Sequence, residues 1–475
     1  GDDMTQVKCW LASLSWMFVA GMVSTVSHAA PTIYPTGTTI YYPDKAWNGY
    51  TVYRTPDDKG VVLIDMNGNV VRRWTDVVGL GRILPDGHIM GVAAEEFPNG
   101  NDGAELVQQD WDGNVIWSFN RTEQMETEDG RASWSARLHH DWQREGFHAG
   151  YYAPDNSPDI RGGKTLILAH KNMMVPEISG RRLNDDYILE VSWDGALLWD
   201  WLASDHVDEM GLSEAARRAI RQSGAEGRPL TTGVDMDVVI RSQDWLHINS
   251  ATYLGPNRWY DKGDERFHPD NVIISSRHAN IVAIIARNGE IVWRMGPDFR
   301  ETEALLEIGQ VIGQHHPHII PTGLPGAGNL MVFDNGGAAG YGEPTPVAPD
   351  GRNNVARRSS RVLEIDPVTM EIVWEYSMSG HSSFRFLSWN VGAAQRLPNG
   401  NTLITEGSAG RAFEVTVDGE IVWEYLNPYF YASDNTRHNI YRAYRVPYDW
   451  VPQLDTPEER AVVPPHPSEF HIEPQ

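Results

Sequence analysis

The stretch IVAIIARNGEIVW, residues 281–293, contains an apolar run, an Asn-Gly dipeptide and a second apolar run that ends in Trp293. Strand-like runs on both sides of Asn-Gly are typical of a β-hairpin, because Asn and Gly adopt the positive φ angles that a two-residue turn requires. The stretch therefore predicts two antiparallel strands joined by a tight turn.

The same pattern occurs six times along the 475-residue chain. Five copies use Asn-Gly or Asp-Gly, and one uses the longer turn that begins at Asp366-Pro367. The copies end at Trp74, Trp117, Trp199, Trp293, Trp374 and Trp423. A pattern that recurs in this way within one chain indicates a repeat architecture, in which each tryptophan packs between neighbouring sheets.

A second hairpin accompanies most copies, with a Leu-Pro-x-Gly turn or a similar one, as in GRILPDGHIMG (81–91) and AAQRLPNGNTLITEG (393–407). Two hairpins per copy make a four-stranded sheet, and six such sheets predict an all-β, six-bladed β-propeller. The segment YRAYRVP (441–447) is expected to close the ring with the N-terminal strand. Long spacings between the middle tryptophans predict inserted loops and short helices over one face, including a helix at 213–224 that begins after Ser213.

The first 30 residues predict a cleaved secretory signal peptide, because Lys8 precedes the apolar run 10–23 and small residues follow that run. The mature chain would then lack cysteine, since Cys9 is the only one. We expect a lead-in segment at 31–50, the propeller at 51–450 and a Pro-rich tail at 451–475. The expected location is periplasmic or secreted, without a membrane anchor.

The formal net charge of −25 argues against nucleic acid as a partner, because phosphate polymers are repelled by an acidic surface. The same charge disfavours anionic polysaccharides, although a local basic patch could override it.

Histidines recur at one place in the repeat, on the strand that follows each tryptophan and lines the propeller centre. Three segments carry them: RLHHDWQREG (137–146), DWLHINSATYL (244–254) and GQHHPHIIP (313–321). Convergent histidines suit either acid–base and anion chemistry near neutral pH or a divalent metal. The catalytic candidates are His139, His140, His247, His315 and His316.

Further polar residues are expected near these histidines. Arginine suits bidentate binding of sulfate or carboxylate. Asp334 and Asn335 follow the third segment, where a simple turn is the favoured interpretation. The substrate-binding candidates are Asn249, Arg277, His278, Arg361 and Arg411.

The chain resembles the bacterial arylsulfate sulfotransferase family in the segments DWLHINS, SSRHANIVAIIARNGEIVWRMG, GQHH, NLMVFDNG and SSRVLEID, and in its C-terminal YRAYRV. The resemblance covers about residues 50–447 and implies a periplasmic six-bladed propeller. It implies transfer of a sulfuryl group from an aryl sulfate to a phenol through a sulfated histidine, without a nucleotide donor. It also implies that His247 and His315 are active-site histidines and that Arg361, or another arginine after FDNG, holds the sulfate.

The chain departs from the family pattern near TEGSAGRAFEV (405–415), where the family's nucleophilic histidine is expected and Arg411 stands instead. Either His139, His140 or His316 replaces it, or transfer activity is absent. The chain is thus a divergent member by this resemblance.

Two other functions remain open from the sequence. One is a polysaccharide lyase, with a base such as His139, Tyr151 or Tyr152 and Arg144 to neutralise a uronate. The other is a non-enzymatic propeller that binds a metal or a small ligand. For the transferase we expect small aromatic sulfates and phenols as partners, a monomer or homodimer, and no required cofactor, while a divalent metal at the histidines stays an alternative.

Overall fold

The computed structural model describes residues 36–93, 102–126, 130–226, 244–378, 380–431, 437–464 and 466. The chain divides into the units Gly1–Ile33 and Tyr34–Gln475, and all described residues belong to the second. The expected signal peptide at 1–30 lies outside the described residues, as does the end of the expected tail. In the part that is described, no helix is long and apolar enough to cross a membrane.

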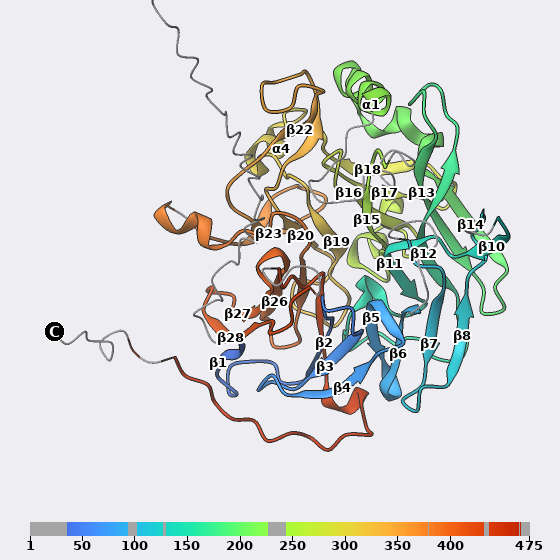
Figure 1. The fold of residues 1–475 in the computed structure, drawn as a ribbon. Coiled ribbons are helices and arrows are strands. Elements are labelled where there is room, and N and C mark those ends of the chain that lie inside the picture. The colour runs from blue at the N-terminus through green and yellow to red at the C-terminus, as the bar shows by residue number, and fades with distance from the viewer. Residues whose placement is uncertain are drawn as a thin grey trace, which may run out of the picture. The chain divides into compact units, whose positions relative to one another are not determined.

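Six antiparallel sheets follow one another along the chain and form a six-bladed β-propeller, as the repeats predict (Figure 1). Each Trp-ending repeat forms the two outer strands of a blade, and the accompanying hairpin forms the inner two. The first strands of neighbouring blades, such as those of the third, fourth and fifth blades, pack against one another. These inner strands carry the histidine segments.

The first three blades are built as follows. The first contains β29 (Ala443–Val446), β2 (Tyr50–Arg54), β3 (Val61–Ile64) and β4 (Val70–Trp74). The second contains β5 (Val77–Leu84), β6 (His88–Ala93), β7 (Leu106–Gln109) and β8 (Val115–Phe119). The third contains β11 (Leu138–Arg144), β12 (Thr165–Met173), β13 (Leu183–Val191) and β14 (Leu197–Leu202).

The last three blades repeat this order. The fourth contains β15 (Ile248–Tyr253), β16 (Val272–Ser276), β17 (Ile281–Ile285) and β18 (Ile291–Met295). The fifth contains β19 (His315–Ile319), β20 (Leu330–Asp334), β23 (Arg361–Ile365) and β24 (Ile372–Ser377). The sixth contains β25 (Ala393–Arg396), β26 (Thr402–Glu406), β27 (Arg411–Val415) and β28 (Ile421–Leu426), with β1 (Gly37–Tyr41) added at its outer edge.

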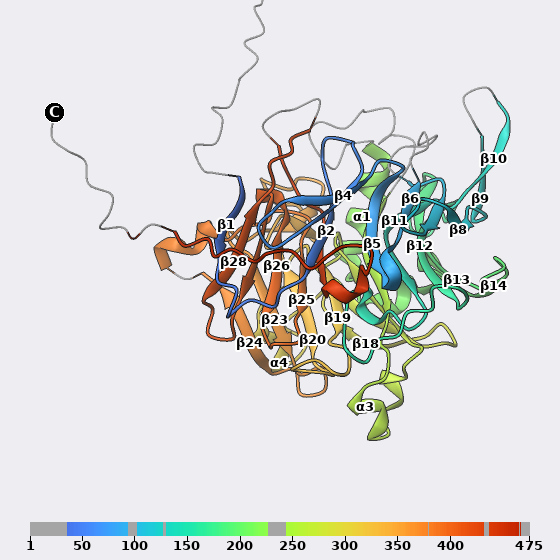
Figure 2. The same ribbon diagram turned by 90° about the horizontal axis from the view of Figure 1, so that it is seen from below.

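Both ends of the described chain close the ring. β29 pairs with β2 through Tyr50 and Val446, which confirms the predicted closing strand. The expected lead-in segment is partly a strand, because β1 pairs with β28 through Tyr41 and Trp423. The described part of the tail is an extended strap that runs past β1 and β2 (Figure 2), and its Val462 exchanges backbone hydrogen bonds with Tyr41.

The repeated tryptophans join neighbouring blades, as predicted. In five of the six copies the indole Nε1 donates to a backbone carbonyl oxygen in the turn of the next blade, at 2.8 to 2.9 Å. The donor–acceptor pairs are Trp117–Trp193, Trp199–Arg287, Trp293–Pro367, Trp374–Val417 and Trp423–Met66. At the remaining junction Arg72 Nη2 donates to the carbonyl oxygen of Trp111 at 2.6 Å, and Trp74 packs edge-on against the Trp111 ring.

Insertions supply the remaining elements. Two small sheets pair β9 (Glu123–Glu126) with β10 (Ala132–Ser135) and β21 (Ala339–Tyr341) with β22 (Arg352–Val355). The helices are α1 (Glu214–Glu226), α3 (Arg258–Asp261) and α4 (Glu303–Ile308). Short 3-10 helices occupy Pro85–Gly87, His148–Gly150, Ala203–Met210, Glu265–Phe267, Gly380–Arg385, Gly407–Ala409 and Tyr448–Trp450. The predicted helix is α1, and Ser213 Oγ accepts from Ala216 N in its first turn at 3.1 Å.

Candidate functional site

The histidine segments enter the propeller centre in the same unusual backbone conformation. His140, His247 and His316 have φ angles of 55°, 51° and 51°, one in each of the third, fourth and fifth blades. Leu80 and Val391 hold the corresponding left-handed conformation in the second and sixth blades. For a residue other than glycine this conformation costs on the order of 1–2 kcal/mol, and such strain is concentrated at functional sites.

Three imidazoles form a contiguous group. The ring of His140 stands edge-on to His247 with centroids 4.6 Å apart, and His278 stacks on the other side of His247 at 4.7 Å. The backbone fixes this arrangement, because Arg277 N donates to His247 O at 3.1 Å and His278 N donates to Leu246 O at 3.0 Å. The residues just before β15 and those just after β16 are therefore held side by side.

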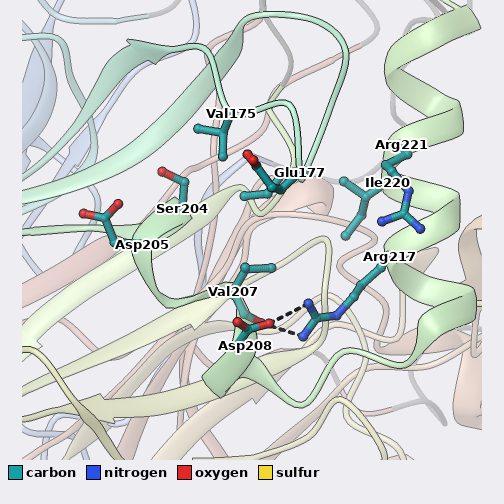
Figure 3. A pocket seen from close by; sticks show the side chains of 10 residues that line it. Val175, Glu177, Ser204, Asp205, Val207, Asp208, Arg217, Ile220 and Arg221 are labelled. Atoms are coloured by element: carbon teal, nitrogen blue, oxygen red, sulfur yellow. Dashed lines mark hydrogen bonds and ion pairs between the residues drawn. The ribbon is translucent and has the colours of Figure 1, made fainter.

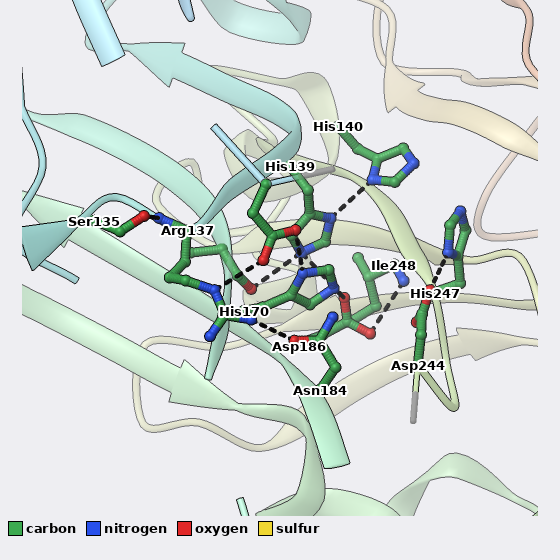
Figure 4. A network of polar contacts seen from close by, with 12 residues as sticks. Ser135, Arg137, His139, His140, His170, Asn184, Asp186, Asp244, His247 and Ile248 are labelled. Atoms are coloured by element: carbon green, nitrogen blue, oxygen red, sulfur yellow. Dashed lines mark hydrogen bonds and ion pairs between the residues drawn. The ribbon is translucent and has the colours of Figure 1, made fainter. Parts of the chain in front are cut away.

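Hydrogen bonds determine which ring nitrogens carry protons. Nδ1 of His247 contacts the Asp244 carboxylate (Figure 4). Nδ1 of His278 contacts the Asp244 carbonyl oxygen at 3.2 Å. Because an oxygen of either kind only accepts, both Nδ1 atoms carry a proton, and in the neutral form of each ring Nε2 keeps a lone pair. His139 Nε2 donates to Ala169 O at 3.0 Å, so its Nδ1 accepts from His140 Nδ1 at 2.8 Å. His140 Nε2 therefore also carries a lone pair.

The protonation states of these side chains depend on their burial and on their contacts with Asp244. Burial lowers the pKa of His140 and His278 well below the ordinary histidine value, so both rings are neutral at neutral pH. Burial opposes ionisation of Asp244, but attraction to His247 and His278 outweighs it and holds the pKa of Asp244 well below the usual range. Asp244 is therefore ionised, and the rings of His140 and His278 are neutral.

Arg277 supplies a cation without a carboxylate of its own. It follows β16, and burial lowers its pKa below the usual arginine value. Its Nε is buried and has no hydrogen-bond partner, and none of the described carboxylates forms an ion pair with it. A half-buried guanidinium in this state is suited to bind an anionic ligand.

His315 lies on the neighbouring blade with a fixed ring. Its Nδ1 donates to Asn335 Oδ1 at 2.7 Å and lies 3.0 Å from Gly313 O, and the Asn335 amide is oriented by bonds to Ser388 O and Val391 O. His315 Nε2 therefore holds a lone pair. Burial, together with the charges of Arg277 and Arg442, lowers the pKa of His315 well below the ordinary value.

Other predicted site residues have structural partners. His139 is buried behind His140, and His316 is fully buried with Nε2 donating to Ala149 O at 3.2 Å. Asn249 Nδ2 donates to Gln314 O at 2.8 Å and so joins two blades. Arg361 forms an ion pair with Asp334 at 2.7 Å, and Arg411 contacts Glu406 and Glu424. Neither arginine has a described contact with the histidine group.

Sequence reasoning missed Asp244, Tyr441 and Arg442. The Asp244–His247 spacing in DWLH was a usable signal, because residues three apart at a strand entrance can hydrogen-bond. Tyr441 contacts the His140 ring at 5.8 Å, and Arg442 Nη2 donates to Asn249 O at 2.5 Å. Both belong to the closing segment, whose proximity to the centre depends on the completed ring.

Among the residues that the structure describes, two groups of side chains have the donor types of a metal site. They are Asp244 with His247 and His278, and His139 with His170 and Asp186; in each, the donor atoms lie within 4.8 Å of one another. In the first group one carboxylate oxygen of Asp244 already accepts a hydrogen bond from His247 Nδ1.

The residues required by a lyase lie in the core. Tyr151 is fully buried with its hydroxyl 2.9 Å from His318 Nε2, and the Arg144 guanidinium is sandwiched between Trp117 and Trp193. Tyr152 stacks on Trp47. Because of these contacts, none of these possible bases faces the same substrate position as Arg144. The lyase interpretation is therefore not supported.

A cavity of about 460 Å³ lies apart from the histidines, between α1, the 3-10 helix Ala203–Met210 and the loop at 175–178 (Figure 3). Its arginines are engaged, since Arg217 pairs with Asp208 at 2.7 Å and Arg221 pairs with Glu214 at 3.0 Å. The cavity therefore offers no unpaired cation for a sulfate.

Comparisons with known proteins were made at the level of sequence and of structure. A search of curated proteins finds no match. A Bacteroides caccae protein of unknown function is similar over 84% of this chain and 99% of its own, with 11% identity and a TM-score of 0.42. A catalytically inactive virginiamycin B lyase from Staphylococcus aureus with quinupristin is similar over 82% and 88%, with 9% identity and a TM-score of 0.35. The Cps50 (Swd1) β-propeller domain from Myceliophteria thermophila is similar over 83% and 90%, with 10% identity and a TM-score of 0.35. The sequence model for the arylsulfotransferase (ASST) family matches residues 160–428.

Proposed function

Because this chain belongs to the arylsulfotransferase family, we propose that it moves a sulfuryl group from an aryl sulfate to a phenol with His247 as the nucleophile. The observation that carries this choice is the contact between His247 Nδ1 and the Asp244 carboxylate, which leaves a lone pair on Nε2. His247 is also the most accessible part of this pair, with 24% of its side chain exposed. The matched segment 160–428 includes both residues.

In the first step, His247 Nε2 attacks sulfur and the bond from sulfur to the aryl oxygen breaks. The electron pair leaves with the phenolate, and the ring gains positive charge as the N–S bond forms. Asp244 stabilises that charge because its ionised carboxylate accepts the Nδ1–H hydrogen bond. The resulting intermediate is a sulfated histidine.

In the second step, the acceptor phenol oxygen attacks sulfur and the N–S bond breaks, which returns the electron pair to His247. The phenol proton passes to His315 Nε2, whose lone pair is fixed by the Asn335 contact, and then to solvent or to the released phenolate. Atoms and charge balance over the two steps without a redox partner.

Arg277 is assigned to the sulfate oxygens. Its guanidinium is half-buried, lacks an ion-pair partner among the described residues and lies where its charge acts on His278 and His315. Charge-assisted hydrogen bonds to an anion contribute about 1.5–3 kcal/mol each in such surroundings. Arg361 and Arg411 are not assigned to the sulfate, because carboxylates already hold them.

The proposal includes a cell location and partners. An exported, periplasmic or secreted chain would meet small aromatic sulfates and phenols directly, and the chemistry above requires no cofactor. The acidic composition supports a small-molecule partner over nucleic acid.

The test is release of nitrophenolate from 4-nitrophenyl sulfate with and without phenol. Phenol-stimulated release that is lost in His247→Ala and retained in His206→Ala supports the proposal, since His206 is outside the centre and pairs with Glu209. Release that survives in His247→Ala, or no turnover of any activated aryl sulfate, contradicts it.

A further inference from the structure

A second polar group lies directly behind His140 and does not take part in the proposed transfer. It consists of His139 on β11, His170 on β12 and Asp186 on β13, three adjacent strands of the third blade (Figure 4). Their exposed fractions are 5%, 4% and 0%. A carboxylate with no exposure requires strong compensation, because burial of an unpaired charge is costly.

Two atoms in this group have no hydrogen-bond partner. They are His170 Nε2 and Asp186 Oδ1, both fully buried. Asp186 Oδ1 lies 3.7 Å from His170 Nε2 and 3.3 Å from His139 Nε2. The other carboxylate oxygen of Asp186 accepts from Ile248 N at 3.1 Å, and this contact aims Oδ1 at the two imidazoles. Unsatisfied buried polar atoms that converge in this way require an explanation.

The outer side of His170 is held by a carboxylate. His170 Nδ1 donates to Asp102 Oδ1 at 2.9 Å, and Asp102 Oδ2 accepts from Arg137 Nε at 2.8 Å. In metal sites the ligating histidine usually donates its other nitrogen to such a carboxylate, which fixes the tautomer that leaves Nε2 free for the metal.

A cation beside the group would keep its buried carboxylates ionised. Asp102, Asp185 and Asp186 are all buried, and Arg137 is the basic side chain that contacts this set through Asp102. One solution is a proton on His170. A divalent ion supplies more positive charge than a proton and can be coordinated by both unsatisfied atoms at once.

We propose that His139 Nε2, His170 Nε2 and Asp186 Oδ1 bind a divalent transition-metal ion of the Zn²⁺ class. Two imidazoles and one carboxylate are suitable donors for such an ion. The His139 and His170 rings now stack with centroids 3.6 Å apart. Binding would turn them about χ2, a torsion with a broad minimum in histidine.

Binding has a consequence at the reaction centre. His139 Nε2 would exchange its hydrogen bond to Ala169 O for the metal, so its proton would move to Nδ1. His139 Nδ1 would then donate to His140 Nδ1, and the His140 proton would move to Nε2. The metal would thereby convert His140 Nε2 from an acceptor into a donor that can contact a sulfate oxygen.

The test is metal content and affinity of the untagged full-length protein. After dialysis against Zn²⁺ and then buffer, mass spectrometry is expected to find one ion per chain in the wild type and in Asp244→Asn, and almost none in Asp186→Asn. Asp102→Asn is expected to weaken Zn²⁺ binding about 10- to 100-fold, because it removes the outer partner of His170.

Cobalt spectroscopy keeps the proposal testable if these variants do not fold. Co²⁺ added to the wild type should give the strong visible d–d absorption of a site with low coordination number, and Zn²⁺ should displace it. No uptake of either ion by the wild type, or undiminished uptake by folded Asp186→Asn, would overturn the proposal and leave a proton on His170 as the compensating charge. Loss of uptake in Asp244→Asn alone would instead place the ion on the other group and contradict this assignment.

Discussion

His247 Nδ1 donates a hydrogen bond to the carboxylate of Asp244, three residues earlier in the chain. The pair stands where the inner strand of the fourth blade begins, with His140 on one side and His278 on the other. An ionised carboxylate that accepts a hydrogen bond from an imidazole both orients a nucleophile and stabilises the charge it acquires.

The Asp244→Asn variant tests the carboxylate separately from the nucleophile. An amide at this position can no longer stabilise a positive ring, and it can also favour the wrong His247 tautomer. We expect kcat for aryl sulfate transfer to fall about 10²–10⁴-fold with KM little changed. Steady-state kinetics would measure this, and an unchanged kcat in the folded variant would remove Asp244 from the mechanism.

Arg277 should determine the affinity for the sulfate. In Arg277→Lys the charge remains but the planar fork is lost, so we expect kcat/KM to fall about tenfold, and about 100-fold in Arg277→Ala. Arg361→Lys and Arg411→Lys serve as matched controls because those arginines are paired with carboxylates. Equal losses in all three lysine variants would argue against a specific role of Arg277.

Acid should destabilise the fold through the buried imidazoles. The pKa values of His140, His278 and His315 are lowered by burial, so these rings are neutral in the folded protein. Below about pH 6.5 the same rings are protonated in the unfolded chain, which then binds more protons than the folded state. We therefore expect the urea midpoint to decrease as the pH falls from 7 to 5. A midpoint that is constant over this range would contradict the assigned neutral state.

In protein stripped of metal with a chelator, His170 should make the fold less stable at alkaline pH. This pH dependence is opposite to that expected from His140, His278 and His315. Burial opposes protonation of His170, but the Asp102 contact and the nearby Asp186 raise the pKa of His170 to about 9. The stabilising contribution of this raised group is complete below the unfolded value of about 6.5 and is lost as the pH rises through about 9. His170→Gln should remove this alkaline loss of stability. Urea unfolding of both proteins between pH 7 and 10 measures it, and identical alkaline slopes would contradict the expectation.

The tryptophan contacts between blades should stabilise the closed ring. Trp423 joins the last blade to the first through Met66 O, and Trp423→Phe leaves that carbonyl without its donor. We expect a loss of about 1–3 kcal/mol in unfolding free energy. The matched control is Trp134→Phe, because Trp134 is 46% exposed and should change stability by less than about 0.5 kcal/mol. Similar losses in both variants would indicate a general effect of removing tryptophan.

The propeller could be predicted because its signals are local. Each Trp-ending hairpin carries its own turn residues and its own apolar alternation, and the copies fix the blade number. The equivalent places of His140, His247 and His316 followed from the same register. A left-handed backbone at these places could not be predicted, because it results from contacts among blades.

The site was harder to predict where the contacts of a residue involve side chains from neighbouring strands. Arg361 and Arg411 looked like sulfate ligands in isolation, but Asp334 lies opposite the first, and Glu406 and Glu424 contact the second. His170 and Asp186 lie on second and third strands, where the sequence gives no sign that they face His139. Pairing between strands of a blade decides these contacts.

The most direct test of the account is mass spectrometry of the enzyme after rapid mixing with an aryl sulfate in the absence of a phenol. The account predicts one added SO₃ on the peptide that contains His247, and loss of this group when phenol is added. A sulfated His140, His315 or His316 with unmodified His247 would contradict the assignment of the nucleophile. Phenol-dependent transfer without any sulfated histidine would contradict the two-step mechanism itself.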